Sequence, residues 1–181
     1  MRFTICHELD APLDAVELAL LSPELGPRLG RKVASLESVV TVEHAIEGGE
    51  MRRVLRFQAS APLPIFRGRE LSREAMAWEE TSTYRLTEHA STWSVAPLGF
   101  RGGGRRGEGG GAGEEPWRRY FRSEGTYRLE PLPGGRTRRC VEGSLEVRVP
   151  VLGPLVERMA MTEVRRTYDA EADTLRELSV L

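Results

Sequence analysis

The amino-acid sequence predicts an α+β domain in which a curved, seven-stranded antiparallel sheet is covered by one long C-terminal helix. The clearest evidence is a change of period in the last third of the chain. Residues 141–149 alternate between apolar or small and polar side chains, which is typical of a strand with one dry face. After a break at Pro150 and Gly153-Pro154, apolar residues recur every three or four positions, as in an amphipathic helix. A helix of about 25 residues is roughly 40 Å long and needs a broad apolar surface to lie on.

The first part of the chain supplies one strand and two short helices. Residues 3–9 alternate as a strand does, and residues 14–21 are typical of a short helix. Ser22 and Pro23 suit the cap and the first position of a second helix, which we expect the glycines at 26 and 30 to keep short.

Five more strands are expected before the one at 141–149. Residues 36–47 and 51–59 alternate on either side of a Gly-Gly turn, and further strands are indicated at 76–86, around Trp93 and at 121–129. Because successive strands joined by hairpins pair antiparallel, this order favours an antiparallel sheet with the last helix on its dry face. In the first of these strands, one face is expected to hold Leu36, Ser38, Val40, Val42, His44 and Ile46.

We expect one domain over residues 1–181, interrupted by a flexible loop. Residues 99–115 hold nine of the 19 glycines and only one apolar side chain larger than alanine, which predicts a solvated tip between two strands. The segment 62–66 is unusually apolar for a loop, so it is expected to be either a lid over a pocket or a plug on the helix.

Composition excludes several classes of function. The 26 basic and 27 acidic residues give a formal charge of −1, which argues against a nucleic-acid partner. No apolar run reaches the roughly 18–20 residues that span a bilayer, so no stable membrane insertion is expected. The three histidines are scattered and no metal-ligand spacing is present, which predicts neither a metal nor a cofactor. With no signal-like segment, we expect a cytoplasmic protein whose Cys6 and Cys140 are free thiols.

Three segments resemble the START/Bet v 1-like superfamily, which has the helix-grip fold and includes polyketide cyclases. They are residues 11–16, 20–24 and 143–153. The chain departs from this pattern at Glu17, where relatives often carry an aromatic residue, and in the long 99–115 insertion. The resemblance implies that the helix crosses the concave face of the sheet and leaves an apolar tunnel for a lipid, sterol or aromatic polyketide. It also implies neighbouring first and last strands, on which the two cysteines could approach each other.

Polar residues on the predicted dry faces are candidates for a site. A buried carboxylate is costly without a partner, which makes Glu80 the most anomalous residue, followed by His44. One strand lies between the strands that carry Glu80 and His44, so the backbones of these two residues are about 10 Å apart. A water or a ligand group could bridge their side chains. The structural alternative is that such groups are solvated at strand ends or hydrogen-bonded in the core. The residues expected to face inward are His7, His44, Glu80, Ser82 and Ser123.

The function expected from these features is binding or transport of a small hydrophobic or amphipathic ligand. One alternative is a cyclase- or dehydratase-type enzyme with Glu80 or His44 as general acid or base, although no catalytic group has a visible partner. Another is a co-chaperone-like interaction module, which a nearly filled cavity and an exposed apolar patch would favour. The sequence leaves the ligand and the oligomeric state open. The expected ligand-binding residues are Phe57, Trp78, Glu80, Tyr84, His44, Phe121, Tyr127 and Met159.

Overall fold

The computed structural model describes residues 1–60, 77–98, 121–148 and 153–180. It confirms the predicted order of one strand, two short helices, six strands and a long helix. The segments 62–66 and 99–115, with their expected roles as lid or plug and as flexible tip, lie outside the described residues. The strands are β1 (Arg2–Leu9), β2 (Leu36–Glu47), β3 (Glu50–Ala59), β4 (Ala77–Arg85), β5 (Ala90–Pro97), β6 (Phe121–Leu132) and β7 (Arg136–Val147), and the helices are α1 (Leu13–Leu21), α2 (Leu25–Lys32) and α3 (Gly153–Leu178).

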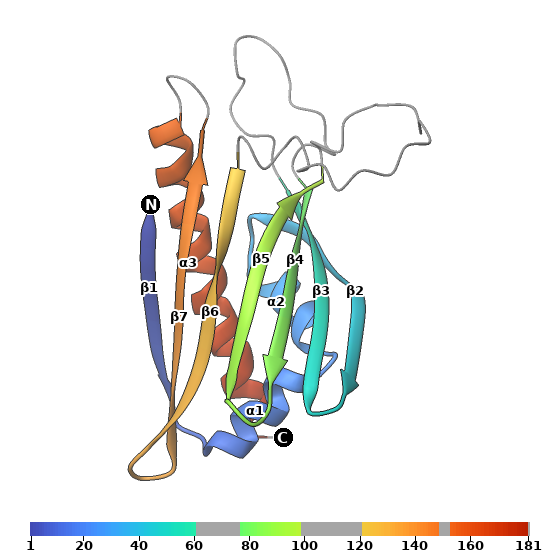
Figure 1. The fold of residues 1–181 in the computed structure, drawn as a ribbon, viewed down its shortest axis with the longest axis vertical. Coiled ribbons are helices and arrows are strands. Elements are labelled where there is room, and N and C mark those ends of the chain that lie inside the picture. Colours follow the sequence, from blue (N-terminus) through green and yellow to red (C-terminus); the bar gives the residue numbers. More distant parts are fainter. Residues whose placement is uncertain (61–76, 99–120, 149–152, 181) are drawn as a thin grey trace.

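The seven strands form one antiparallel sheet in the order β1-β7-β6-β5-β4-β3-β2. All pairs except β1–β7 join strands that follow each other along the chain, as hairpin connections require. Figure 1 shows the three helices on one face of this sheet, with α3 running along it from the β1–β7 side toward α1. The α+β helix-grip arrangement predicted from the sequence is therefore confirmed.

Two glycines let aromatic side chains meet above the sheet. Gly143 pairs with Phe3 on one side and with Gly125 on the other, and Gly125 pairs with Trp93. A Cβ atom at Gly143 would lie only 2.5 Å from Trp93 Cζ2 and 2.8 Å from Phe3 Cζ. The centroids of the two rings are consequently only 6.1 Å apart, although two strands lie between the strands of Phe3 and Trp93. This contact sets the position of Trp93 in the interior.

Helix α2 begins at Leu25 rather than at Pro23, and it contains both glycines that were expected to limit it. A Cβ atom at Gly26 would lie 3.0 Å from Leu55 Cδ2, and one at Gly30 would lie 3.1 Å from the backbone nitrogen of Val39. The missing side chains allow α2 to pack directly on strands β2 and β3.

Strand β2 departs from the predicted alternation. Its register against β3 shifts twice, within residues 36–38 and within residues 41–43. An extra residue in one strand reverses the face on which the following side chains lie. Val39 is therefore buried, whereas Val40 and Val42, predicted to face inward, are 52% and 48% exposed.

The hydrophobic core consists of two clusters between the sheet and the helices. The larger one joins strands β1 and β3–β7 to helices α1 and α3 and to Leu25 at the start of α2, and the smaller one joins the rest of α2 to strands β2 and β3. Helix α3 contributes Met161, Ala172 and Leu175 to the larger cluster. Among the residues that the structure describes, no helix has both the length and the apolar character needed to cross a bilayer.

Cys6 on β1 and Cys140 on β7 form a disulfide, so the expectation of two free thiols is wrong. The antiparallel register places these residues directly opposite each other, with Cα atoms 4.2 Å apart. Opposite residues in an antiparallel pair are about 4.5–5.5 Å apart, which is close enough for a disulfide. The expectation assumed the reducing conditions of the cytoplasm. The register of β1 and β7 instead places the two sulfur atoms close enough to form a bond.

Candidate functional site

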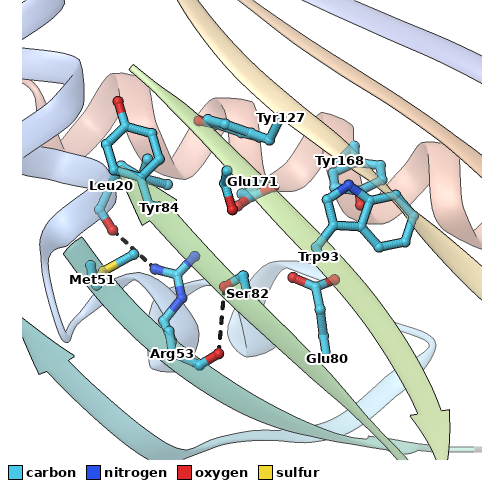
Figure 2. A pocket seen from close by; sticks show the side chains of 11 residues that line it. Leu20, Met51, Arg53, Glu80, Ser82, Tyr84, Trp93, Tyr127, Tyr168 and Glu171 are labelled. Atoms are coloured by element: carbon cyan, nitrogen blue, oxygen red, sulfur yellow. Dashed lines mark hydrogen bonds between the residues drawn. The ribbon is translucent and has the colours of Figure 1, made fainter. Parts of the chain in front are cut away.

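A small cavity lies between strands β3–β6 and helix α3. Its volume is about 20 Å³, which is room for roughly one water molecule. Figure 2 shows that aromatic, polar and charged side chains share its wall. Strands β3 and β4 contribute Arg53, Glu80 and Ser82, while β6 and α3 contribute Tyr127, Tyr168 and Glu171.

Arg53 is 5% exposed and lies in the middle of β3, opposite His44 on one neighbouring strand and Ser82 on the other. Its Nη1 donates a hydrogen bond of 3.0 Å to the carbonyl oxygen of Leu20 at the end of α1. Its Nε is buried and has no hydrogen-bond partner among the described residues. Since buried donors are almost always satisfied, this free N–H marks a place where an acceptor belongs.

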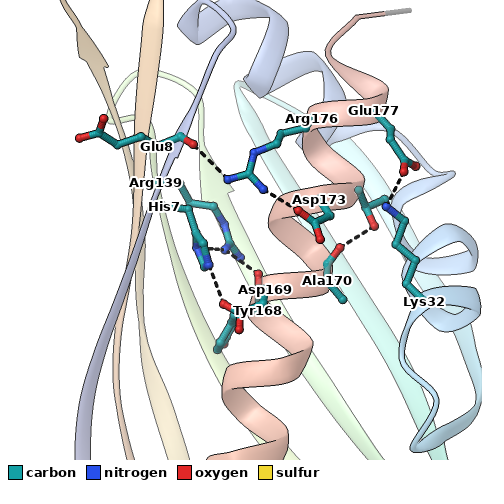
Figure 3. A network of polar contacts seen from close by, with 11 residues as sticks. His7, Glu8, Lys32, Arg139, Tyr168, Asp169, Ala170, Asp173, Arg176 and Glu177 are labelled. Atoms are coloured by element: carbon teal, nitrogen blue, oxygen red, sulfur yellow. Dashed lines mark hydrogen bonds and ion pairs between the residues drawn. The ribbon is translucent and has the colours of Figure 1, made fainter.

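Arg139 on β7 is completely buried, and Figure 3 shows how it joins the sheet to α3. Its Nη2 forms an ion pair with the Glu171 carboxylate, and its Nη1 donates to the carbonyl oxygen of Tyr168 at 3.3 Å. The guanidinium also lies over the rings of Tyr127 and Tyr168, at 4.8 and 5.3 Å from their centroids. Arg139 therefore has an ion pair and two aromatic rings against its guanidinium, although its Nε, like that of Arg53, has no hydrogen-bond partner among the described residues. The two arginines differ in that Arg53 lines the cavity and Arg139 does not.

His7 links this arginine to the surface. Arg139 Nη1 lies 3.3 Å from His7 Nδ1, and His7 Nε2 lies 2.8 Å from an oxygen of Asp169. Because a guanidinium only donates, Nδ1 must accept, which assigns the proton of His7 to Nε2. His7 faces α3, as predicted, and it positions Arg139.

Glu80 faces Glu171 across the cavity (Figure 2). Burial, followed by the negative charge of Glu171, raises the pKa of Glu80 to about 7, while Arg53 and Arg139 act in the opposite direction. Near neutral pH this carboxyl group is divided between its protonated and ionised forms. We call Arg53, Glu80, Arg139 and Glu171 the buried charge cluster.

The tyrosines around the cavity remain protonated. Burial raises the pKa of Tyr127 to about 12, and it also raises the pKa of Tyr84 and of Tyr168. The hydroxyl of Tyr84 donates a hydrogen bond of 2.7 Å to Glu17, which also lies 2.9 Å from His89 Nδ1. At Glu17, where the resemblance predicts an aromatic residue, the carboxylate ties α1 to the end of the β4–β5 hairpin.

Three of the predicted ligand-binding residues, Glu80, Tyr84 and Tyr127, line the cavity. Two others do not. Phe57 and Trp78 stack on each other in the smaller core cluster, with ring centroids 5.4 Å apart.

The remaining predictions lie elsewhere. His44 is opposite Arg53 on the outer strand β2, where burial and then the charge of Arg53 lower the pKa of its imidazole. The bridge predicted between His44 and Glu80 is thus occupied by Arg53, on the strand that separates them. Phe121 packs at the margin of the larger cluster, and the side chain of Met159 lies outside the described residues.

Sequence reasoning missed Arg53, Arg139 and Glu171. Arg53 is two residues away from both Met51 and Leu55, so the alternation of the strand places it on the same inner face. In the same way, Arg139 lies on the inner face with Val141. The alternation used for Glu80 would have identified both arginines. Glu171 precedes the buried Ala172 in α3, and only the three-dimensional position of Arg139 explains its burial.

The cavity differs from the apolar tunnel that the resemblance implies. Ligand pockets usually measure about 300–1,000 Å³ and are mostly apolar. The cavity here is far smaller because Trp93 and Tyr168, with ring centroids 6.4 Å apart, fill the space between sheet and helix. Among the described residues, no group of three or more His, Cys, Asp or Glu side chains has the arrangement of a metal site.

Comparison with solved structures identifies the fold. The Zhui aromatase/cyclase from a Streptomyces species has a TM-score of 0.61 at 15% identity, covering 99% of this chain and 93% of its own. Norcoclaurine synthase from Thalictrum flavum has a TM-score of 0.58 at 16% identity, covering 99% and 87%. A START superfamily protein from Mycobacterium smegmatis has a TM-score of 0.54 at 14% identity, covering 98% of each chain. This is the START/Bet v 1-like fold.

At these identities the likeness concerns the fold alone. Residues 115–178 also match a family described as a protein of unknown function, DUF2505. This match includes β6, β7 and α3, the part of the START/Bet v 1-like fold that carries Arg139, Tyr168 and Glu171. No curated protein sequence matches the chain.

Proposed function

We propose that this protein binds a small amphipathic molecule between the sheet and α3, with the polar group of the ligand at the buried charge cluster. The observation that carries the proposal is the Arg53 guanidinium, which is buried beside a cavity with its Nε–H unsatisfied. A buried and incompletely satisfied charge is costly for stability, and such groups concentrate at binding sites. The START/Bet v 1-like fold of the chain supports a site between sheet and helix.

The small volume of the cavity adds a requirement. An amphipathic ligand needs a space at least ten times larger than about 20 Å³, so binding requires the sheet and α3 to separate. The apolar part of the ligand would then replace the contacts that Trp93 and Tyr168 now make with each other. Binding by this route is coupled to a change of conformation.

Nile red, an uncharged fluorescent dye, tests the proposal. The variant Ser91→Leu adds bulk at the cavity wall, and Thr92→Leu makes the same change on the next residue of β5, which is exposed. We expect saturable binding to the wild type and an affinity about tenfold lower in Ser91→Leu, because the added side chain blocks the site. Thr92→Leu is expected to bind as the wild type does.

Two outcomes would contradict the proposal. One is the absence of saturable dye binding by the wild-type protein, and the other is equal affinity in the wild type and in a folded Ser91→Leu. Native mass spectrometry of the protein purified from its own host would show directly whether a small molecule accompanies it.

A cyclase- or dehydratase-type enzyme is the second candidate. The specific observation is the pKa of Glu80 at about 7, close to the value that suits general acid–base catalysis at neutral pH. For a poly-β-ketone substrate, this alternative predicts that Glu80→Gln lowers turnover by about 10²–10⁴-fold while binding persists. His44 is a weaker candidate for this role, since Arg53 stands between it and the cavity.

The interaction-module alternative also has one observation in its favour. Val40, Val42 and Ile46 are exposed apolar residues on the edge strand β2, and the cavity is nearly filled. These residues give no indication of the partner's chemistry. This alternative therefore gains support only if the dye experiment fails.

A further inference from the structure

We infer that the ligand carries a carboxylate, which accepts hydrogen bonds from the Arg53 guanidinium and from the protonated carboxyl group of Glu80. This inference rests on the proposed function and names the chemical class of its ligand. It follows from three features of the buried charge cluster: an unequal charge balance, a free donor and a pair of facing carboxyl groups.

The first feature is that the positive charges of the two buried arginines are not equally balanced by negative charges. Arg139 has an ion pair with Glu171 and two aromatic rings against its guanidinium. Arg53 forms no ion pair with any described residue, and its one side-chain hydrogen bond goes to the neutral carbonyl group of Leu20. The site therefore has one positive charge more than it has fixed negative charges whenever Glu80 is protonated, and an anion is the group that balances it.

The second feature is the free donor of Arg53. Arg53 lines the cavity, and its Nε–H has no acceptor among the described residues. A guanidinium binds a carboxylate through two parallel N–H groups more strongly than it binds a neutral carbonyl group. An amine would add a second positive charge beside the Arg53 guanidinium, and an alcohol would leave the charge of Arg53 without a counter-charge.

The third feature is the pairing of Glu80 with Glu171. The groups that affect Glu80 are Glu171 and Tyr168 from α3, Arg53 from β3 and Arg139 from β7. Tyr127 from β6 also lines the cavity, and His44 lies beyond Arg53 on β2. A second carboxylate in the cavity would favour the protonated form of Glu80 further, as in other sites where two carboxyl groups share a proton. Glu80 then acts as a donor to the ligand.

Three probes with the same alkyl chain test the inference: dodecanoate, dodecanol and dodecylamine, each measured by displacement of Nile red at about pH 6. We expect dodecanoate to bind about tenfold or more tightly than dodecanol, since a charge-assisted hydrogen bond is stronger than a neutral one. Dodecylamine is expected to bind most weakly. Arg53→Met should remove the preference for dodecanoate, whereas Arg56→Met, on the exposed face of the same strand, should keep it.

A pH series gives a second, independent readout. The affinity for dodecanoate should fall about tenfold between about pH 6 and about pH 8, because Glu80 ionises over this range and then repels the ligand. Glu80→Gln, which stays neutral, should bind dodecanoate equally well at both values.

The possible outcomes separate the inference from the proposed function. Equal affinities for dodecanoate and dodecanol in the wild type would contradict the inference that the ligand carries a carboxylate. They would not contradict the proposed binding of an amphipathic ligand. Absence of binding by all three probes would overturn both. If Arg53→Met does not fold, the head-group comparison in the wild type and the pH profile of Glu80→Gln decide the question.

Discussion

Arg139 is completely enclosed, and it contacts the sheet and α3 at once. Arginine normally lies on protein surfaces, and a buried one is retained only where its partners are also built in. Here Glu171 and the carbonyl group of Tyr168 contact it from α3, and His7 contacts it from β1. The cluster therefore depends on the tertiary structure as a whole.

Replacing Arg139 tests this dependence. Arg139→Met leaves the Glu171 carboxylate buried without its partner, so we expect the free energy of unfolding to fall by about 3–5 kcal/mol. Arg138→Met, on the exposed face next to it, should cost less than about 1 kcal/mol. Urea unfolding of both variants provides the comparison, and equal losses would contradict the account.

Glu80 should make stability depend on pH. Its pKa is raised from the ordinary 4.5 to about 7, so the folded state binds this proton more tightly than the unfolded state does. The stabilisation is complete below about pH 4.5 and is lost as the pH rises through about 7, by up to about 3 kcal/mol. Relative to the wild type, Glu80→Gln should thus gain stability over this range.

Unfolding measured in urea at several pH values checks this prediction. Glu88→Gln, in the exposed turn that follows β4, is the control and should follow the wild-type profile in this range. A constant difference between wild type and Glu80→Gln from about pH 4.5 to about pH 8 would show that Glu80 has an ordinary pKa.

At the scale of elements, one row of residues crosses the strands β1, β7, β6 and β5. Phe3, Gly143, Gly125 and Trp93 follow each other across these strands, and the glycines provide the space that the rings occupy. Packing in such a row tolerates no added atom unless a ring moves.

Gly143→Ala places a methyl group against both rings, and we expect a loss of about 1–3 kcal/mol in stability. Ser144→Ala, on the opposite face of β7, should change stability by no more than about 0.5 kcal/mol. Thermal unfolding followed by tryptophan fluorescence reports both effects. A Gly143→Ala variant as stable as the wild type would mean that the rings do not lie over this position.

The disulfide joins β1 to β7 across a sequence separation of 134 residues. Closing so long a loop restricts the unfolded chain, so reduction should lower the free energy of unfolding by about 2–5 kcal/mol. The double variant Cys6→Ser, Cys140→Ser should be insensitive to reductant. Alkylation of two thiols in the folded protein without reductant would rule out the disulfide.

At the scale of the whole molecule, patterns with a short period predicted most of the fold. The alternation of residues 141–147 and the helical repeat after Gly153 depend only on neighbouring side chains, and both elements are confirmed. The register shifts of β2 were not predictable, because the pairing with β3 decides them. The disulfide likewise depends on a pairing between the two ends of the chain.

The candidate site was less predictable than the fold. The alternation of side chains indicated Glu80, Tyr84 and Tyr127, but Arg53 and Arg139 were not among the predicted site residues. The cavity volume depends on how the rings of Trp93 and Tyr168 pack against each other. The periodicity of the sequence does not predict this packing. The resemblance therefore predicted the place of the cavity and not its size or polarity.

A crystal structure of the protein with dodecanoate tests the central claim most directly. The account predicts that the carboxylate lies within hydrogen-bonding distance of Arg53 and Glu80, with α3 displaced from the sheet to admit the alkyl chain. Dodecanoate bound elsewhere on the molecule, with the space between sheet and helix still closed, would contradict it.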